Sequence, residues 1–188
     1  KGDQKIYLNG LVSAVDQGQE LVEDLLELSR ISGATRQFET IDLGRFLHEL
    51  IGFINLSADV EVVLGDDWPS IDAKPAFLKQ IFQNLIINAI KFNRSKGKRV
   101  EIDWRPIGQD RYEFCVRDNG IGIEPRYHEQ IFHVFQRLHT REEYEGTGIG
   151  LAIVKKAASK LHGAICIKSE PGKGSSFLVT LPKTQKEI

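Results

Sequence analysis

Residues 84–92 read NLIINAIKF and lie within a segment, 75–93, whose apolar spacing predicts one long helix. On that helix, Asn84, Asn88 and Lys91 fall within about a 60° arc, while large apolar side chains occupy the opposite side. Amide oxygens suit Mg²⁺, which also binds phosphate oxygens and water, and an ammonium group can neutralise phosphates. The strip therefore indicates a site for a metal-bound phosphate, the alternative being an ordinary polar face turned to solvent.

Two glycine-rich segments follow this helix along the chain. The first, DNGIGI at 118–123, comes after an expected strand. It sets Asp118 beside glycines whose backbone can approach a ligand closely, although an Asp-Asn-Gly sequence is also typical of an ordinary tight turn. The second, GTGIGLAIVKK at 146–156, runs into an apolar helix, so its free N–H groups favour an anion, most often phosphate. Neither a dinucleotide fingerprint nor a Walker loop is present. No strand precedes the second segment, and Ile167 stands where a Walker loop ending at 172–175 needs glycine.

The remaining elements mix strands and helices without strict alternation. We expect strands at 38–41, 61–64, 100–105, 112–118, 165–169 and 176–181, helices at 43–54, 75–93 and 149–162, and loops at 65–70 and, with one short helix, at 119–147. This mixture predicts an α+β fold rather than a doubly wound one.

The N-terminal residues 1–32 are expected to form one long helix, because no proline interrupts them and their apolar side chains recur at spacings of three and four. The resulting seam consists of Leu8, Leu11, Val15, Gly18, Val22, Leu25 and Ser29. Gly33 suits the position after a helix end, which divides the chain into residues 1–33 and a globular domain at 34–188. The helix is either half of a helical hairpin or a helix folded back on its own domain.

The composition argues against several classes of function. With 25 basic and 26 acidic residues, the chain has no general charge that would attract nucleic acid or an anionic membrane. No apolar run approaches the ~20 residues of a bilayer span. Cys115 and Cys166 lack metal-ligand spacing, which favours free thiols in a reducing compartment and hence the cytoplasm. Because its 188 residues contain no methionine, we interpret the chain as a piece of a longer polypeptide.

Together, the motifs resemble the ATP-binding catalytic domain of sensor histidine kinases in both order and spacing. Residues 84–92 are similar to the asparagine box of that family, 118–123 to its first glycine box and 146–151 to its second. IFHVFQR at 131–137 resembles the phenylalanine box, and GKGSSF at 172–177 resembles the closing glycine-and-hydroxyl segment.

Two further segments resemble particular parts of these kinases. The lid, RLHTREEYE at 137–145, is most similar to the phytochrome-like branch. LVEDLLELSR at 21–30 resembles the second helix of the dimerisation and phosphoacceptor hairpin, whose first helix, with the acceptor histidine, would lie upstream. His48 is a poor acceptor candidate, because it follows that hairpin helix and lacks the basic residue and proline of an acceptor box.

The resemblance implies a fold and a function. The fold would be a two-layer α/β sandwich of the GHKL type (Bergerat fold), with helices on one face of a mixed sheet, ATP under a lid, and one long helix in front. The protein would be a histidine kinase of two-component signal transduction. It would bind ATP and Mg²⁺ and transfer the terminal phosphate to a histidine on a helix missing from this chain. The phosphate would then pass to a response-regulator aspartate, and the hairpin would make a homodimer. This fragment is not expected to phosphorylate itself.

The resemblance also implies roles for individual residues. Asn88 would bind Mg²⁺ with Asn84 in support, Lys91 would contact a phosphate, and Arg137 would meet the terminal phosphate, so Asn88, Lys91 and Arg137 form the expected catalytic set. Asp118 would accept the adenine amino group and would repel guanine, which has a carbonyl there. The other expected nucleotide-binding residues are Phe92, Gly120, Gly122 and Ile123, then Thr147, Gly148, Gly150 and Leu151 at the phosphates, and Ser176 on the adenine side.

Three residues near these motifs carry structural expectations. Phe132 and Phe135, one turn apart, are expected to anchor the lid to the core. Lys74 stands where the family often has an acidic helix cap, which removes a contact worth about 1 kcal/mol.

Two other functions fit parts of the pattern. A scaffold pseudokinase would bind nucleotide without transferring phosphate, although the intact Asn88 and Asp118 argue against it. Another GHKL ATPase, such as a gyrase or a chaperone, would hydrolyse ATP with a glutamate base one helical turn before the metal-binding asparagine. This chain has Asn84 at that position, and an amide cannot take the proton.

Overall fold

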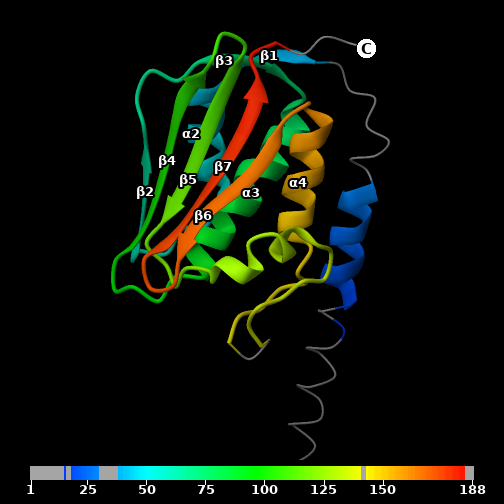
Figure 1. The fold of residues 1–188 in the computed structure, drawn as a ribbon, viewed down its shortest axis with the longest axis vertical. Helices are drawn as coiled ribbons and strands as arrows, with labels where there is room; N and C mark the ends of the chain where they lie inside the picture. Colours follow the sequence, from blue (N-terminus) through cyan, green and yellow to red (C-terminus); the bar gives the residue numbers. More distant parts are fainter. Residues whose placement is uncertain (1–14, 16–17, 30–37, 141–142, 185–188) are drawn as a thin grey trace, which may run out of the picture.

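The chain's computed structural model describes residues 15, 18–29, 38–140 and 143–184, and residues 18–29 form a helix (Figure 1). The elements that follow are β1 (Glu39–Asp42), α2 (Leu43–Phe53), β2 (Val60–Leu64), β3 (Ser70–Ala73), α3 (Pro75–Lys91), β4 (Lys98–Ile107), β5 (Arg111–Asp118), the 3₁₀ turns η1 (Pro125–Tyr127) and η2 (Gln130–Phe132), α4 (Gly150–Lys160), β6 (Ala164–Glu170) and β7 (Gly174–Pro182). Within this part of the chain, every helix is too short or too polar to span a bilayer.

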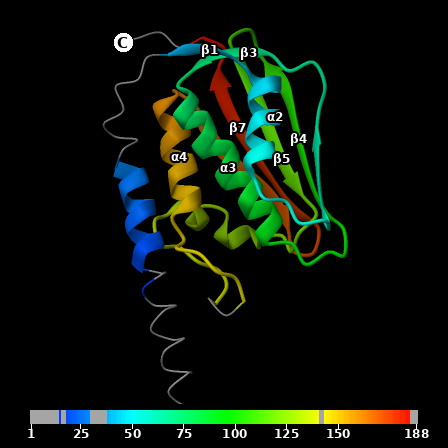
Figure 2. The same ribbon diagram turned by 180° about the vertical axis from the view of Figure 1, so that it is seen from behind.

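Five strands form one mixed sheet in the order β2-β4-β5-β7-β6, and β1 and β3 form a separate antiparallel pair. β2 runs parallel to β4, whereas the other neighbouring strands of the large sheet are antiparallel. α2, α3 and α4 cover one face of this sheet, as the two opposite views show (Figures 1 and 2). The predicted α+β class and two-layer sandwich are therefore confirmed.

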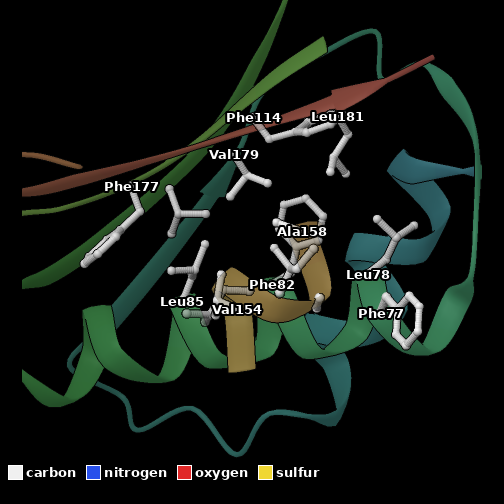
Figure 3. Close-up of a cluster of buried hydrophobic side chains, with 14 of the residues drawn as sticks. Phe77, Leu78, Phe82, Leu85, Phe114, Val154, Ala158, Phe177, Val179 and Leu181 are labelled. Carbon is white, nitrogen blue, oxygen red and sulfur yellow. The ribbon is translucent and has the colours of Figure 1, made fainter. Parts of the chain in front are cut away.

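The hydrophobic core lies between the sheet and the helices α3 and α4 (Figure 3). Phe82 on α3 meets Phe114 on β5 edge to face, with ring centroids 5.8 Å apart. Every second side chain of a strand points to the same face, and in β5 Phe114 and Val116 point inward. Asp118, the last residue of β5, is the next position of this inward-pointing set and is also buried. The last inward position of a hydrophobic strand is thus a carboxylate, and this carries Asp118 into the interior of the domain.

The starts of α2 and α3 differ in their caps. Asp42 accepts a hydrogen bond from the Arg45 N–H at 3.1 Å and so caps α2. Lys74, which precedes α3, gives no side-chain cap bond, and Pro75 takes the first turn. Proline suits that position because its missing N–H has no partner within the helix there.

The short strand β3 is absent from the sequence prediction, whose loop at 65–70 overlaps it only at Ser70. It pairs with β1 in the register Ile41–Ile71 and buries Ile71 and Ala73. A four-residue strand has too short a pattern for its period to be recognised, and its partner lies about 30 residues earlier in the chain. Tertiary pairing therefore decides this element.

The N-terminal helix, residues 18–29, lies beside α4 in both views (Figures 1 and 2). Leu21 and Leu28 pack against the core, whereas Val22, Leu25 and Leu26 are 55%, 43% and 50% exposed. Several members of the predicted seam are thus open to solvent in a single copy. The expectations for Leu8, Leu11 and Gly33 fall outside the described residues.

Candidate active site

A cavity of about 440 Å³ opens where the C-terminal half of α3, the end of β5, the lid and the start of α4 meet. Twelve of the expected site residues line it: Asn84, Asn88, Lys91, Phe92, Asp118, Gly122, Ile123, Arg137, Thr147, Gly148, Gly150 and Leu151. Gly120 and Ser176 do not. Segments up to 67 residues apart in sequence, from Asn84 to Leu151, thus come together as the motifs predicted.

The polar strip of α3 faces this cavity. Asn84 donates a hydrogen bond from Nδ2 to the Gln80 carbonyl at 2.8 Å. Its Oδ1 points at the second glycine segment, where a Cβ on Gly150 would lie only 2.7 Å from it. The Asn88 amide has no hydrogen-bond partner among the described residues and lines the cavity. Both amides are therefore held at the cavity wall, with one oxygen close to the glycine backbone.

Lys91 brings a positive charge to the same wall, with Nζ 5.0 Å from the centre of the Phe92 ring. Burial lowers the pKa of Lys91, and the Arg137 guanidinium lowers it further, while the carboxylates of Glu145, Glu20 and Asp24 oppose this shift. Two cations near one another in a half-buried cavity repel unless an anion lies between them. This end of the cavity is therefore suited to a polyanion.

Asp118 lines the same cavity and is only 9% exposed. Its Oδ1 accepts hydrogen bonds from the Gly120 N–H at 2.8 Å and the Ser175 N–H at 3.2 Å. Oδ2 has no donor among the described residues. Burial raises the pKa of Asp118, and the two backbone hydrogen bonds partly offset this effect. The site thus presents a fixed carboxylate with one oxygen available to a donor.

Gly120 supports this carboxylate from behind, which explains why it does not line the cavity. A Cβ at this position would meet the Phe92 carbonyl and would lie 2.8 Å from Asp118 Oδ1. The Ile121 N–H donates to that same Phe92 carbonyl at 3.0 Å. The first glycine segment therefore closes directly against the end of α3, and any side chain at position 120 would separate them.

The second glycine segment places backbone amides at the polyanion end. Gly146 and Gly148 have φ values of +121° and +76°, which glycine tolerates far better than other residues do. The segment leads into α4, whose N-cap Ile149 provides no side-chain cap. The first N–H groups of an uncapped helix are available to an anion. Glycine backbone and Thr147 therefore form this part of the cavity wall.

Residues on both sides of 141–142 in the lid segment line the cavity, and the Tyr144 ring packs against Phe92, just past the end of α3. Arg137 donates from Nη2 to the Tyr144 carbonyl at 2.9 Å. The Tyr144 ring lies 4.9 Å from Phe92 and 5.2 Å from His139, centroid to centroid. Arg94 stacks over the Tyr144 ring, 5.0 Å from its centroid. Tyr144 and His139, which sequence reasoning did not assign to the site, thus fasten the lid near Phe92.

Two expectations of the sequence analysis are wrong. Ser176 was expected on the adenine side, but alternation along β7 turns it to the other face of the sheet, where Arg117 donates to its hydroxyl at 3.4 Å. Its neighbours Ser175 and Phe177 line the cavity instead. Phe132 is buried, at 8% exposure, as a lid anchor should be, but Phe135 is 57% exposed. A positive φ of +64° at Phe135 redirects the chain and turns that side chain outward.

The histidines lie mostly away from the cavity, and only His139 lines it among the described residues. His48 is exposed on α2, where its Nδ1 contacts the Gly44 carbonyl at 2.8 Å. No group of three His, Cys, Asp or Glu side chains that could hold a metal is found in the described part of the chain. A metal at this site would therefore be held by the amides together with a ligand that brings its own oxygens.

Comparison with known proteins agrees with this geometry. Residues 73–185 match the family described as histidine kinase-, DNA gyrase B- and HSP90-like ATPases. The chain belongs to this family.

Relatives narrow the assignment within the family. The chain is 37% identical over 183 residues to the phytochrome-like protein Cph1 of Synechocystis sp., which covers 96% of the chain and 24% of the relative. It is 34% identical over 193 residues to the circadian input-output histidine kinase CikA of Synechococcus elongatus, covering 96% of the chain and 25% of the relative. The chain thus spans about a quarter of the length of these relatives and is an ATP-binding catalytic domain of the sensor histidine kinase type.

Solved structures agree with the fold. Full-length ShkA in complex with AMPPNP matches with a TM-score of 0.76 at 26% identity, over 98% of this chain and 40% of that one. The mycobacterial sensor histidine kinase MprB matches with a TM-score of 0.69 at 24% identity, over 79% of this chain and 99% of that one. The second likeness shows a shared fold.

Proposed function

We propose that this domain binds Mg-ATP and transfers the terminal phosphate to a histidine on a helix outside this chain, for relay to a response-regulator aspartate. A single observation carries the proposal. One cavity joins a buried carboxylate, Asp118, to a cationic end where Lys91, Arg137 and the second glycine segment meet. That polarity matches a ligand with a neutral, hydrogen-bonding base at one end and a polyphosphate at the other.

The adenine would lie at the Asp118 end. Oδ1 is held by two backbone amides, so Oδ2 is fixed in position to accept the exocyclic amino group of adenine. Guanine presents a carbonyl oxygen there, which a carboxylate repels. Hydrogen bonds to charged groups are worth about 1.5–3 kcal/mol, enough to select ATP over GTP.

The phosphates would lie between Lys91, Arg137 and the backbone of 146–151. These groups neutralise charge and position the terminal phosphate for in-line attack by an imidazole nitrogen. Phosphoryl transfer asks little covalent chemistry of the protein, because positioning and charge stabilisation supply most of the rate. We assign Lys91 and Arg137 to this role together with Asn88.

Mg²⁺ fits the amides of α3. The Asn88 amide faces the cavity without a partner among the described residues, and Asn84 Oδ1 lies close to the glycine backbone across from it. Amide oxygens are hard ligands, and Mg²⁺ usually takes only one or two protein ligands and completes its shell with phosphate and water. The metal would neutralise phosphate charge, while Asn88 holds its position.

The structure also favours transfer over hydrolysis. Asn84, one turn before Asn88, donates to the helix backbone and cannot act as a base for water. The exposed side chains of Val22, Leu25 and Leu26 leave an apolar face that the first helix of a hairpin would cover, and a second copy would complete the dimer. We therefore propose residues 1–33 as the second hairpin helix and 34–188 as the catalytic domain. ATP use and the free thiols favour the cytoplasm.

Calorimetric titration with Mg-ATP tests the proposed phosphate end. Lys91→Ala should weaken binding about tenfold or more, because a half-buried charge facing a phosphate is lost. Lys79→Ala is the matched control, since Lys79 is an exposed lysine of the same helix and does not line the cavity. Equal losses in both variants would show that Lys91 acts only through general charge and would refute its assignment.

A further inference from the structure

The N-terminal helix reaches the phosphate end of the cavity with acidic side chains. Glu20, Glu23 and Asp24 all line the cavity, although they are more than 55 residues from any other lining residue. The Asp24 carboxylate accepts a hydrogen bond from the hydroxyl of Thr147, in the second glycine segment. A carboxylate therefore already holds one of the groups proposed to meet a phosphate.

The same helix also acts on the proposed phosphate-binding lysine. The negative charges of Glu20 and Asp24 both favour the charged form of Lys91. In the docked arrangement, the cationic end of the cavity is thus partly neutralised by the protein itself. A polyphosphate entering that end would meet these carboxylates, and like charges in a half-buried cavity repel strongly.

Packing explains how the helix keeps this position. Leu21 and Leu28, two turns apart, pack against the core of the domain. Between them, Glu27 accepts a hydrogen bond from Gln80 Nε2 on α3 at 3.2 Å. Glu20, Asp24 and Glu27 follow the i, i+4, i+7 spacing of a single helix face. The apolar contacts place that face against α3 and the glycine segment.

We propose that the helix at 18–29 is an autoinhibitory element whose carboxylates, Asp24 with Glu20, take the place of nucleotide phosphates at Thr147 and Lys91. The inference rests on the proposed position of the phosphates. Mg-ATP and the docked helix then compete for the same groups, so nucleotide binding requires the helix to leave. Whatever holds the helix away raises the affinity for ATP, because the apparent dissociation constant scales inversely with the fraction of competent molecules.

If the helix competes with ATP, removing its carboxylate charges from the cavity should tighten the binding of Mg-ATP. The double variant Glu20→Gln, Asp24→Asn should bind Mg-ATP roughly five- to tenfold more tightly than the unmodified chain, whereas its affinity for adenosine should not change. Glu27→Gln is the matched control, because it removes a charge from the same helix face, keeps an oxygen that accepts from Gln80, and does not line the cavity. It should bind ATP as the unmodified chain does.

Calorimetry on the full chain and its variants decides the matter, with amide hydrogen exchange of residues 18–29 as a second measurement. Exchange there should speed up when Mg-ATP binds, because the helix undocks. Unchanged ATP affinity in the double variant, or slower exchange on binding, would overturn the proposal. A loss of affinity confined to Mg²⁺-containing buffer would also overturn it and make the carboxylates metal ligands instead. If the unmodified chain binds no ATP at all, the proposed function itself fails.

Discussion

Replacing Asp118 by asparagine changes one atom of the site and reverses its hydrogen-bonding character. The amide oxygen of the new side chain can keep the hydrogen bonds from Gly120 and Ser175, which now hold Oδ1 at 2.8 and 3.2 Å. The amide nitrogen then takes the place of Oδ2 and presents donors to the adenine amino group, which is also a donor. The variant therefore loses the recognition contact while it keeps the local fold.

The size of the effect follows from the kind of bond that is lost. A hydrogen bond to a charged group contributes about 1.5–3 kcal/mol, which corresponds to roughly a 10- to 150-fold loss of affinity. We expect the upper part of that range, because two donors are left facing each other at a position only 9% exposed.

Stability should move in the opposite direction to affinity. Burial raises the pKa of Asp118, so its favourable contribution is fully present below the pKa of an unfolded aspartate and is lost as pH rises through the higher folded pKa. At neutral pH the buried charge is therefore a cost that asparagine removes. The variant should melt at the same temperature as the unmodified chain or higher.

Calorimetric titration with ATP and GTP, alongside thermal unfolding, tests this reasoning. Asp72→Asn serves as the control, since Asp72 accepts a hydrogen bond from Thr40 at 2.7 Å and does not line the cavity. ATP binding by Asp118→Asn as tight as that of the unmodified chain would refute the assignment. Equal binding of ATP and GTP by the unmodified chain would refute it independently.

The remaining predictions concern the metal, pH and the lid. Asn88→Ala should reduce the affinity for ATP more in buffer with Mg²⁺ than in buffer with EDTA, which calorimetry in both buffers would measure. Equal losses of affinity would show that Asn88 is not a metal ligand. The pKa of Asp118 is raised, so on acidification the affinity for ATP should begin to fall at a higher pH than protonation of an ordinary aspartate would cause. The pKa of Lys91 is lowered, so on alkalinisation the affinity should begin to fall at a lower pH than deprotonation of an ordinary lysine would cause. Titration across the pH range tests both effects, and Asp118→Asn should lose only the acid one. Amide exchange at 138–140 and 143–147 should slow on Mg-ATP binding, since the lid is fastened mainly by the Tyr144 ring, and an unchanged rate would argue against a lid.

The local sequence pattern was sufficient to predict the positions of site residues that lie on a single helix, strand or loop. The three polar residues of α3 share one face because of helix geometry alone, so their common position could be derived from residues 84–91. The glycine segments were recognisable because positive φ and close backbone approach require glycine. Asp118 could be placed in the interior by extending the two-residue period of β5, since Phe114 and Val116 precede it at the same parity.

Other features depend on contacts that no local pattern encodes. The side of the sheet to which Ser176 points follows from the register of β7 with β5, where Ser176 pairs with Arg117. Phe135 turns outward because its backbone takes a positive φ, and a phenylalanine in the sequence does not predict this conformation. The carboxylates of residues 20–24 reach the cavity through packing between segments 123 residues apart, such as Asp24 and Thr147. The helix period showed which side chains share a face, but not what that face would meet.

Transfer of phosphate to a supplied acceptor tests the central claim most directly. The chain should be incubated with Mg²⁺ and ATP labelled on its terminal phosphate, alone and with a polypeptide carrying the upstream helix of the full-length protein. We expect no label on the chain alone, and an acid-labile, base-stable label, characteristic of phosphohistidine, on the supplied helix. Asn88→Ala should abolish that label. Failure to label the helix although ATP binds, or an acid-labile label on the chain alone that His48→Ala removes, would contradict the account.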